Sequence, residues 1–237
     1  MNSEETMGYF SVKKKRNFKD KVGLLLFFIL IVCVIYVVVR IIVSPSESES
    51  SKEYVKVRSD YVLMLLQCIL GLIVMFIPSV IERKKSIDIP DSMEILYFIF
   101  LFLAIVLGEV RDFYYIIPYW DIILHAFSAG MLASLGFVLI GIIKKTGHLK
   151  YYLSPFYIAL FSFCFALTMG VIWEIYEYSA DGLLSLNMQK YALADGTKLI
   201  GRKALSDTME DLIVDALSAL VITILGYHQL KKEENTD

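Results

Sequence analysis

Cysteine is scarce in this sequence, and the three cysteines are not arranged for covalent chemistry. Cys33, Cys68 and Cys164 each lie in a different apolar stretch, with no CxxC pair and no two of them in an aqueous loop. This arrangement argues against a disulfide framework. We expect all three to be small, buried apolar side chains.

The common catalytic signatures are also missing. The sequence has no Walker loop, no GxGxxG fingerprint, no HExxH helix and no GxSxG elbow. These absences argue against P-loop, dinucleotide-dependent, zincin and serine-hydrolase chemistry. No convincing internal repeat is present either, which counts against the inverted-repeat architectures of many transporters.

Apolar residues, by contrast, are abundant. With 57% hydrophobic and 14% aromatic residues and a mean hydropathy of +0.62, the chain is too apolar for a soluble domain. A helix that crosses a bilayer needs roughly 17 to 25 residues. The sequence therefore predicts an all-α polytopic membrane protein with about six transmembrane helices, at residues 22–43, 61–81, 95–110, 121–143, 155–178 and 209–228.

The distribution of lysine and arginine predicts the orientation, because these residues concentrate in cytoplasmic loops. A cytoplasmic N-terminus places fourteen of the 23 basic residues inside: Lys13, Lys14, Lys15, Arg16, Lys19, Lys21, Arg83, Lys84, Lys85, Lys144, Lys145, Lys150, Lys231 and Lys232. Both termini are then cytoplasmic. The outer face is acidic, which favours a cation over an anion, and no nucleic-acid partner is expected.

Four regions follow from this topology. Residues 1–21 form a basic cytoplasmic tail, 22–81 a two-helix unit with a Ser/Glu-rich outer loop at 44–60, 95–228 a four-helix membrane core, and 229–237 a second cytoplasmic tail. The outer loop at 182–206 is long but rich in leucine. We expect it to lie on the membrane surface or to fold as a cap over the outer helix ends.

Acidic residues gather at the outer ends of the last three spans. In GVIWEIYEYSAD, Glu174, Glu177 and Asp181 share one helix face, because their spacings are three and four residues. The fourth span opens with Asp121 and, one turn deeper, His125, whose face continues through small residues that let helices approach closely. The sixth opens with residues at successive i, i+4 steps: Asp207, Asp211 and Asp215.

Several of these residues, and the basic residues of the nearby loop, also have an ordinary structural interpretation. Asp121 and Asp207 are well placed as helix N-caps, and Glu210 completes a capping-box spacing with Asp207. A single histidine in an apolar helix, such as His125, is more often a hydrogen-bonded packing residue than a ligand. The basic patch of Lys198, Arg202 and Lys203 is either a phosphate contact or a solvated loop.

Together, the residues predict a divalent-metal site. Crowded carboxylates repel one another unless a cation or shared protons relieve the repulsion. Carboxylates with one imidazole suit Mg²⁺, Mn²⁺, Fe²⁺ or Zn²⁺. The ligand candidates are Glu174, Glu177, Asp211, Asp215 and His125. The candidate catalytic residues are His125, as a ligand or general base, and Asp121, which would orient it; no residue is assigned to an organic cofactor.

The motifs DIILHAFSAG, WEIYEY and DTMED resemble the YjdF-like family of bacterial inner membrane proteins. The matching positions lie in the C-terminal half: Asp121, His125, Gly130, Trp173 to Tyr178, Asp207, Thr208, Asp211 and Asp215. The resemblance implies a multi-span protein of the bacterial plasma membrane. It implies no reaction.

Three functional hypotheses remain from the sequence. The first is metal-assisted hydrolysis or transfer on a lipid-linked or amphiphilic substrate, because the site would open beside the lipid head groups. The second is a cation transporter or a proton-coupled transporter that uses the same carboxylates. The third is a non-catalytic membrane partner protein whose polar cluster ties helices together. Whether the chain is an enzyme, and its oligomeric state, stay open.

Overall fold

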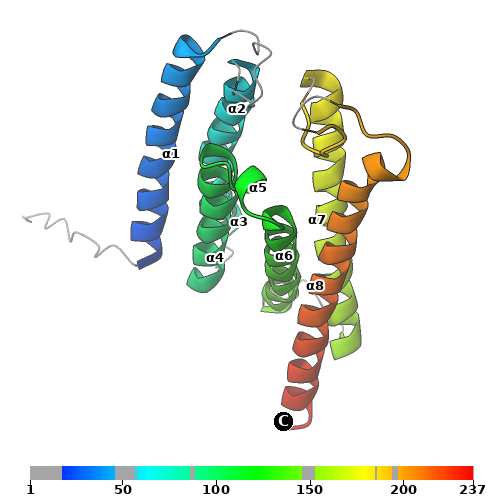
Figure 1. Ribbon diagram of the computed structural model, residues 1–237. Helices are drawn as coiled ribbons and strands as arrows, with labels where there is room; N and C mark the ends of the chain where they lie inside the picture. Colours follow the sequence, from blue (N-terminus) through cyan, green and yellow to red (C-terminus); the bar gives the residue numbers. More distant parts are fainter. Residues whose placement is uncertain are drawn as a thin grey trace, which may run out of the picture.

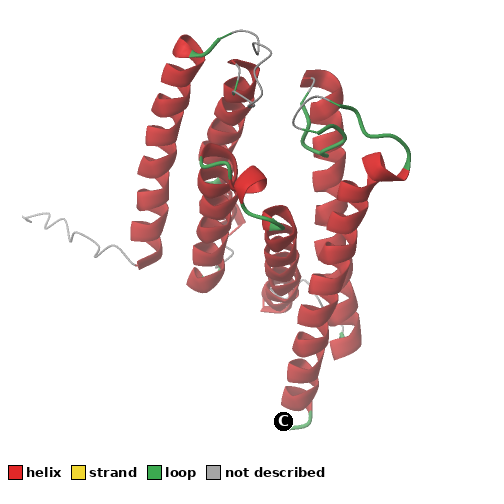
Figure 2. Cartoon of the chain, in the orientation of Figure 1, coloured by secondary structure: helices red, strands yellow, loops and turns green. Residues whose placement is uncertain are grey.

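The structure is a computed structural model that describes residues 18–45, 56, 58–85, 89–145, 153–184, 186–193 and 197–236. Most of the basic N-terminal tail and most of the Ser/Glu-rich loop at 44–60 lie outside the described residues. Within the described part, regular secondary structure is helical apart from one isolated bridge between Ala192 and Lys198. The all-α prediction is confirmed, and Figure 2 shows the helices with loops only at their ends.

The helices follow the predicted spans. The second span is interrupted between α2 and α3, and the third continues without a gap from an α-helix into a π-helix. The elements are α1 (Phe18–Val43), α2 (Arg58–Val74), α3 (Ile77–Lys85), α4 (Asp91–Leu101), the π-helix η1 (Phe102–Val110), α5 (Phe113–Ile116), α6 (Trp120–Lys145), α7 (Pro155–Leu184) and α8 (Arg202–Glu234). In Figure 1 the start of α1 and the end of α8 lie at the same end of the molecule, as a chain with both termini on one side requires.

Five of the six predicted spans are confirmed as helices long and apolar enough to cross a membrane: Phe18–Val43, Asp60–Arg83, Asp91–Val110, Trp120–Lys144 and Pro155–Leu184. The protein is therefore a multi-pass membrane protein. The sixth predicted span lies within α8, which is not among these five. This helix packs along α6 and α7, and its crossing of the membrane stays a prediction.

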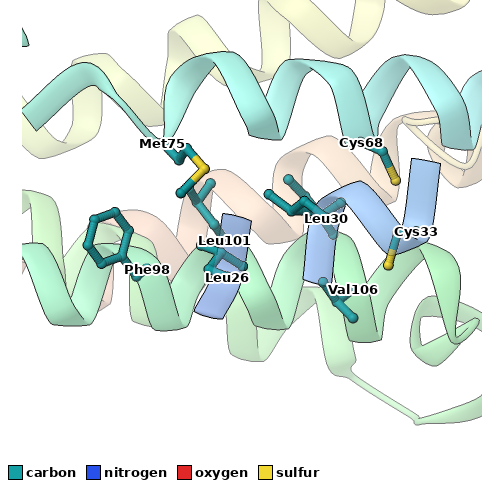
Figure 3. Packing of buried hydrophobic residues seen from close by; sticks show 9 residues of the cluster. Leu26, Leu30, Cys33, Cys68, Met75, Phe98, Leu101 and Val106 are labelled. Carbon is teal, nitrogen blue, oxygen red and sulfur yellow. The ribbon is translucent and has the colours of Figure 1, made fainter. Parts of the chain in front are cut away.

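The N-terminal helices form one apolar core (Figure 3). Its buried side chains come from α1, α2, α4 and η1, with Met75 directly after α2: Leu26, Leu30, Cys33, Cys68, Met75, Phe98, Leu101, Ile105 and Val106. Two of the three cysteines are thus buried, as expected. The prediction for Cys164 was wrong, because this residue is exposed on α7; an apolar thiol can face lipid as readily as the core.

The break between α2 and α3 has a local cause in Pro78. Proline has no N–H, so the carbonyl of Val74 loses the partner that would close the helical turn. The hydroxyl of Tyr97, on α4, donates a 2.9 Å hydrogen bond to this carbonyl. The interruption of the second span is therefore compensated by a side chain from the third, which also fixes α4 against α2.

The last three long helices, α6, α7 and α8, form a second bundle in which small residues lie at the centre. Ala133, Ala166 and Ala219 come from the three different helices, and each is fully buried in their common core. Such residues let helix backbones approach closely. This contact brings the end of α7 together with the starts of α6 and α8, where the acidic residues lie. Phe100 and Phe127 stack between α4 and α6, with ring centroids 6.2 Å apart, and join the two units.

Candidate metal centre

The three helices of the second bundle bring the predicted acidic residues and His125 into one cluster. His125 comes from α6, Glu174 and Glu177 from α7, and Asp211 and Asp215 from α8. All five are buried, with exposed fractions between 2% and 8%. The predicted convergence of these side chains from three helices is confirmed.

The two ring nitrogens of His125 face different carboxylates. Nδ1 lies 3.2 Å from Oδ1 of Asp215, within hydrogen-bonding distance. Nε2 lies 3.8 Å from Oδ2 of Asp211 and 4.0 Å from Oε1 of Glu174. Histidines that bind metals commonly hold one nitrogen on the ion and donate the other N–H to a carboxylate, which fixes the ring and its tautomer. Asp215, rather than Asp121, therefore lies where an orienting carboxylate is needed.

Asp215 fits its position because the facing residue of α7 is a glycine. A Cβ added to Gly170 would overlap the carboxylate of Asp215. The absence of a side chain thus leaves the space in which this carboxylate reaches His125. Asp215 is 2% exposed, so its carboxylate is held by packing on every side.

Other oxygens in the cluster have no hydrogen-bond partner among the described residues. Both carboxylate oxygens of Glu174 and Oδ2 of Asp211 are buried and have no hydrogen-bond partner within 3.5 Å. The Thr208 hydroxyl, which accepts from Gln189, also interacts with the carboxylate of Glu174. One nitrogen of His125 and one oxygen each of Asp121 and Asp211 lie within 4.8 Å of one another. Buried polar atoms are nearly always paired, so unpaired carboxylate oxygens that face an imidazole call for an explanation.

Glu177 differs from its neighbour Glu174 in having a hydrogen-bond donor. Nε1 of Trp173, one turn earlier on α7, donates a 3.0 Å bond to Oε1 of Glu177. This carboxylate also interacts electrostatically with Glu174, Asp121 and His125. Glu177 belongs to the cluster, but its hydrogen bond is with the indole of Trp173 rather than with the imidazole of His125.

A segment of the loop between α7 and α8 folds back over these helix ends (Figure 1). We call residues 186–193 the strap. The carboxylate of Asp181 accepts hydrogen bonds from the backbone N–H groups of Met188 (2.7 Å) and Gln189 (3.0 Å), and the Gln189 side chain donates to the Thr208 hydroxyl (2.9 Å). Residues 188–190 thus contact the outer helix ends, as expected for a cap.

The strap places Lys190 against two carboxylates of the cluster. Its ammonium group contacts Asp121, and it lies 3.1 Å from Oδ1 of Asp207. Burial alone would lower the pKa of Lys190, but Asp121 and Asp207 outweigh this effect and raise the pKa above its ordinary value. Lys190 is therefore cationic.

These contacts correct the capping interpretation of two aspartates. The helix α8 begins at Arg202 after Gly201, so Asp207 lies inside it and cannot be its N-cap. Asp121 is the second residue of α6, and its carboxylate contacts the strap. The acids that the sequence suggests as caps instead hold a lysine from the loop.

Sequence reasoning missed two residues near the cluster. Lys190 lies in an irregular loop, where no periodicity could place it, whereas the basic residues that the sequence singled out (Lys198, Arg202 and Lys203) are exposed. Tyr114, on the short helix α5, is the second. Burial, together with the carboxylates of Glu109 and Asp121, raises the pKa of its hydroxyl well above the ordinary value.

Comparison with known proteins identifies the family. Residues 24–232 match the family model described as "Predicted membrane protein (DUF2238)", so the chain belongs to this family. This agrees with the YjdF-like resemblance. An uncharacterised protein of Thermotoga maritima is 28% identical over 155 residues, which cover 65% of this chain and 71% of the relative. No solved structure matches.

Proposed function

We propose that this member of the DUF2238 family binds a divalent cation between Nε2 of His125 and the carboxylates of Asp121, Asp211 and Glu174. The observation that carries the proposal is the set of buried, unpaired oxygens of Glu174 and Asp211 facing Nε2 of an imidazole whose other nitrogen meets Asp215. The charge distribution of the loops supports placing this site on the outer side of the membrane.

The distances are compatible with one ion. Metal–ligand bonds to imidazole nitrogen and carboxylate oxygen are about 2.0–2.2 Å long, so two ligand atoms of one ion can be at most roughly 4.4 Å apart. The separations of 3.8 and 4.0 Å from Nε2 fall within this limit. The donor set, one imidazole with carboxylates, suits Mg²⁺, Mn²⁺, Fe²⁺ or Zn²⁺.

The geometry divides the predicted ligand set into two groups. His125, Asp211 and Glu174 stay as ligand candidates. Asp121 is added because one of its oxygens lies within 4.8 Å of a nitrogen of His125, on the same helix, and of an oxygen of Asp211 on α8. Asp215 is better suited to positioning His125 from the Nδ1 side. Glu177, held by Trp173, is available for a proton-transfer role beside the ion.

A cation at this site would support hydrolysis or group transfer. A bound divalent ion polarises a carbonyl or phosphoryl oxygen and lowers the pKa of a bound water. The site lies near the ends of three helices, where the predicted spans put the boundary between lipid head groups and the apolar core. A lipid-linked or amphiphilic substrate is therefore the class we favour. The transporter hypothesis is weaker, because the apolar stretches 126–143, 155–173 and 216–227 contain no Asp, Glu, Lys, Arg or His.

The proposal is tested with neighbouring residues of α8. Asp211→Asn removes a buried charge that faces His125, whereas Glu210→Gln removes an exposed charge at the adjacent position. Wild-type protein purified in detergent should contain Mg, Mn, Fe or Zn by elemental analysis. A chelator should lower its melting temperature and the ion should restore it, since a ligand that binds only the folded state stabilises that state.

We expect Glu210→Gln to keep this response and Asp211→Asn to lose most of it. The metal site would be refuted if the wild-type protein contained no divalent ion and its melting temperature changed neither with chelator nor with added ions. Shared protons in a transport or structural cluster would then become the better account. Loss of the response in both variants alike would show that net charge, not the ligand arrangement, causes it.

A further inference from the structure

The strap inserts a positive charge into the same cluster that we propose to hold the ion. The ammonium group of Lys190 contacts Asp121, and one oxygen of Asp121 lies within 4.8 Å of donor atoms of His125 and Asp211. One carboxylate is thus shared between a lysine from the loop and the proposed metal position. An ion that takes Asp121 as a ligand must compete with this lysine.

Contacts other than those of Lys190 hold the strap in place. Asp181, which is 8% exposed on α7, accepts backbone hydrogen bonds from the two residues before Lys190. Gln189 is bonded to Thr208 on α8. Lys190 itself has a φ of +46°, in the left-handed region that few non-glycine residues adopt. The strap is therefore anchored on α7 and α8, and these anchors fix the backbone position of Lys190.

The charges explain why a cation is needed at this position. The cluster contains six carboxylates, those of Asp121, Glu174, Glu177, Asp207, Asp211 and Asp215, within the bundle and its rim. Lys190 neutralises part of the repulsion at the rim, where its side chain is 36% exposed. Lys190 also acts on Asp211 through its charge, but it donates no hydrogen bond to the inner oxygens of Glu174 or to Oδ2 of Asp211. The lysine therefore lies at the rim of the cluster, beside Asp121 and Asp207, and leaves the inner oxygens without a hydrogen-bond donor.

We propose that the ammonium group of Lys190 is a tethered cation: it pairs with the carboxylate of Asp121 in the ion-free protein and is displaced from it when the divalent ion binds. This inference rests on the proposed function, since it concerns the regulation of the same site. Displacement would release the Lys190 ammonium from Asp121 and loosen the strap at this point. Ion binding and the state of the strap would thus be coupled, and each would affect the other by the same factor.

The first test measures ion affinity by calorimetric titration of Mn²⁺ or Zn²⁺ into chelator-treated protein in detergent. Lys190→Met keeps the apolar stem but removes the competing charge, and we expect binding to become about tenfold tighter. Lys198→Met is the matched control, because it removes the same charge from an exposed position of the same loop. It should change the affinity by less than about twofold, through the general field alone.

The second test uses trypsin on the wild-type protein. Cleavage after Lys190 should be slow without the ion and several times faster with it, whereas cleavage after Lys198 in the same sample should be unchanged. Equal affinities for Lys190→Met and Lys198→Met, in a protein that binds the ion, would overturn the displacement and leave the metal site intact. Tight ion binding with unchanged cleavage at Lys190 would also overturn it, because the lysine and the ion would then share Asp121. Absence of ion binding in the wild type and in both variants would overturn the proposed function and the tethered cation together.

Discussion

The contact between Gly170 and Asp215 gives a sharp prediction for a single methyl group. In Gly170→Ala the new Cβ would overlap the Asp215 carboxylate, so either the carboxylate or the helix must move. Asp215 is the group that faces Nδ1 of His125 at 3.2 Å. We therefore expect this substitution to weaken both the packing of α7 against α8 and the orientation of the imidazole.

The loss of stability caused by the overlap with Asp215 can be separated from the change in helix propensity by making the same substitution at a second glycine, Gly141. Replacing glycine by alanine inside a helix stabilises it by roughly 0.5–1 kcal/mol. At Gly141, in α6, an added Cβ meets nothing within 4 Å, so Gly141→Ala should show this gain alone. At Gly170 overpacking opposes the gain by about 1–3 kcal/mol. Propensity cancels in the comparison, and Gly170→Ala should be less stable than Gly141→Ala by about 1–3 kcal/mol.

Two assays measure the outcome. Unfolding of each variant in detergent, followed by tryptophan fluorescence, gives the difference in stability. Titration with the divalent ion gives the affinity, which should fall about 10- to 100-fold in Gly170→Ala, the usual loss when the carboxylate behind a ligating histidine is disturbed. If Gly170→Ala were as stable as Gly141→Ala and bound the ion equally well, the positioning role of Asp215 would be wrong.

Two further predictions concern the frame of the protein. Tyr97→Phe removes the hydroxyl that donates to the carbonyl of Val74 and should destabilise the protein by about 1–3 kcal/mol. The same substitution should cost little in a Pro78→Ala background, because the restored N–H of residue 78 pairs with that carbonyl. Equal losses of stability in both backgrounds would contradict this compensation. For the topology, a single cysteine introduced at Leu193, with native cysteines removed, should react with an impermeant thiol reagent on intact cells, and one at Asn235 should not. The reverse labelling pattern would invert the orientation.

Periodicity in the sequence was enough to predict the helices and the convergence of the cluster. The spacing of Glu174 and Glu177, and of Asp211 and Asp215, places each pair on one helix face, and the alternating directions of the helices bring these faces together. The stripe of small residues in α6 correctly indicated which side of that helix lies in the bundle, since Ala129 and Ala133 are buried.

The division of roles within the cluster could not be predicted, because it depends on contacts between helices. Sequence spacing pairs His125 with Asp121, one turn away, yet the structure places Asp215 of α8 at Nδ1. Likewise, nothing local distinguishes Lys190 from the other basic residues of its loop. The position of Lys190 depends on the fold-back that Asp181 anchors, and Asp181 lies in a helical turn beyond the predicted end of its span.

At the opposite end of the helices from the His125 cluster, ion pairs between helices are made with a lysine. Comparing these ion pairs with the carboxylates around His125 supports a bound cation at that cluster. There, Lys19 of α1 lies 2.8 Å from Glu94, 2.9 Å from Asp91 and 3.6 Å from Glu82.

Glu94 is 4% exposed and Glu174 is 5% exposed, so the two carboxylates lose similar amounts of hydration. Glu94 is compensated by the ammonium of Lys19 at 2.8 Å, whereas Glu174 has no lysine or arginine beside it among the ion pairs of the described residues and meets only the imidazole of His125, at 4.0 Å. Removing a charge from water without a partner costs several kcal/mol. A cluster that only tied α6, α7 and α8 together would be expected to pair its carboxylates as the Lys19 cluster does. Unpaired carboxylates that converge on an imidazole are instead expected where the missing partner is an ion that comes from outside the chain.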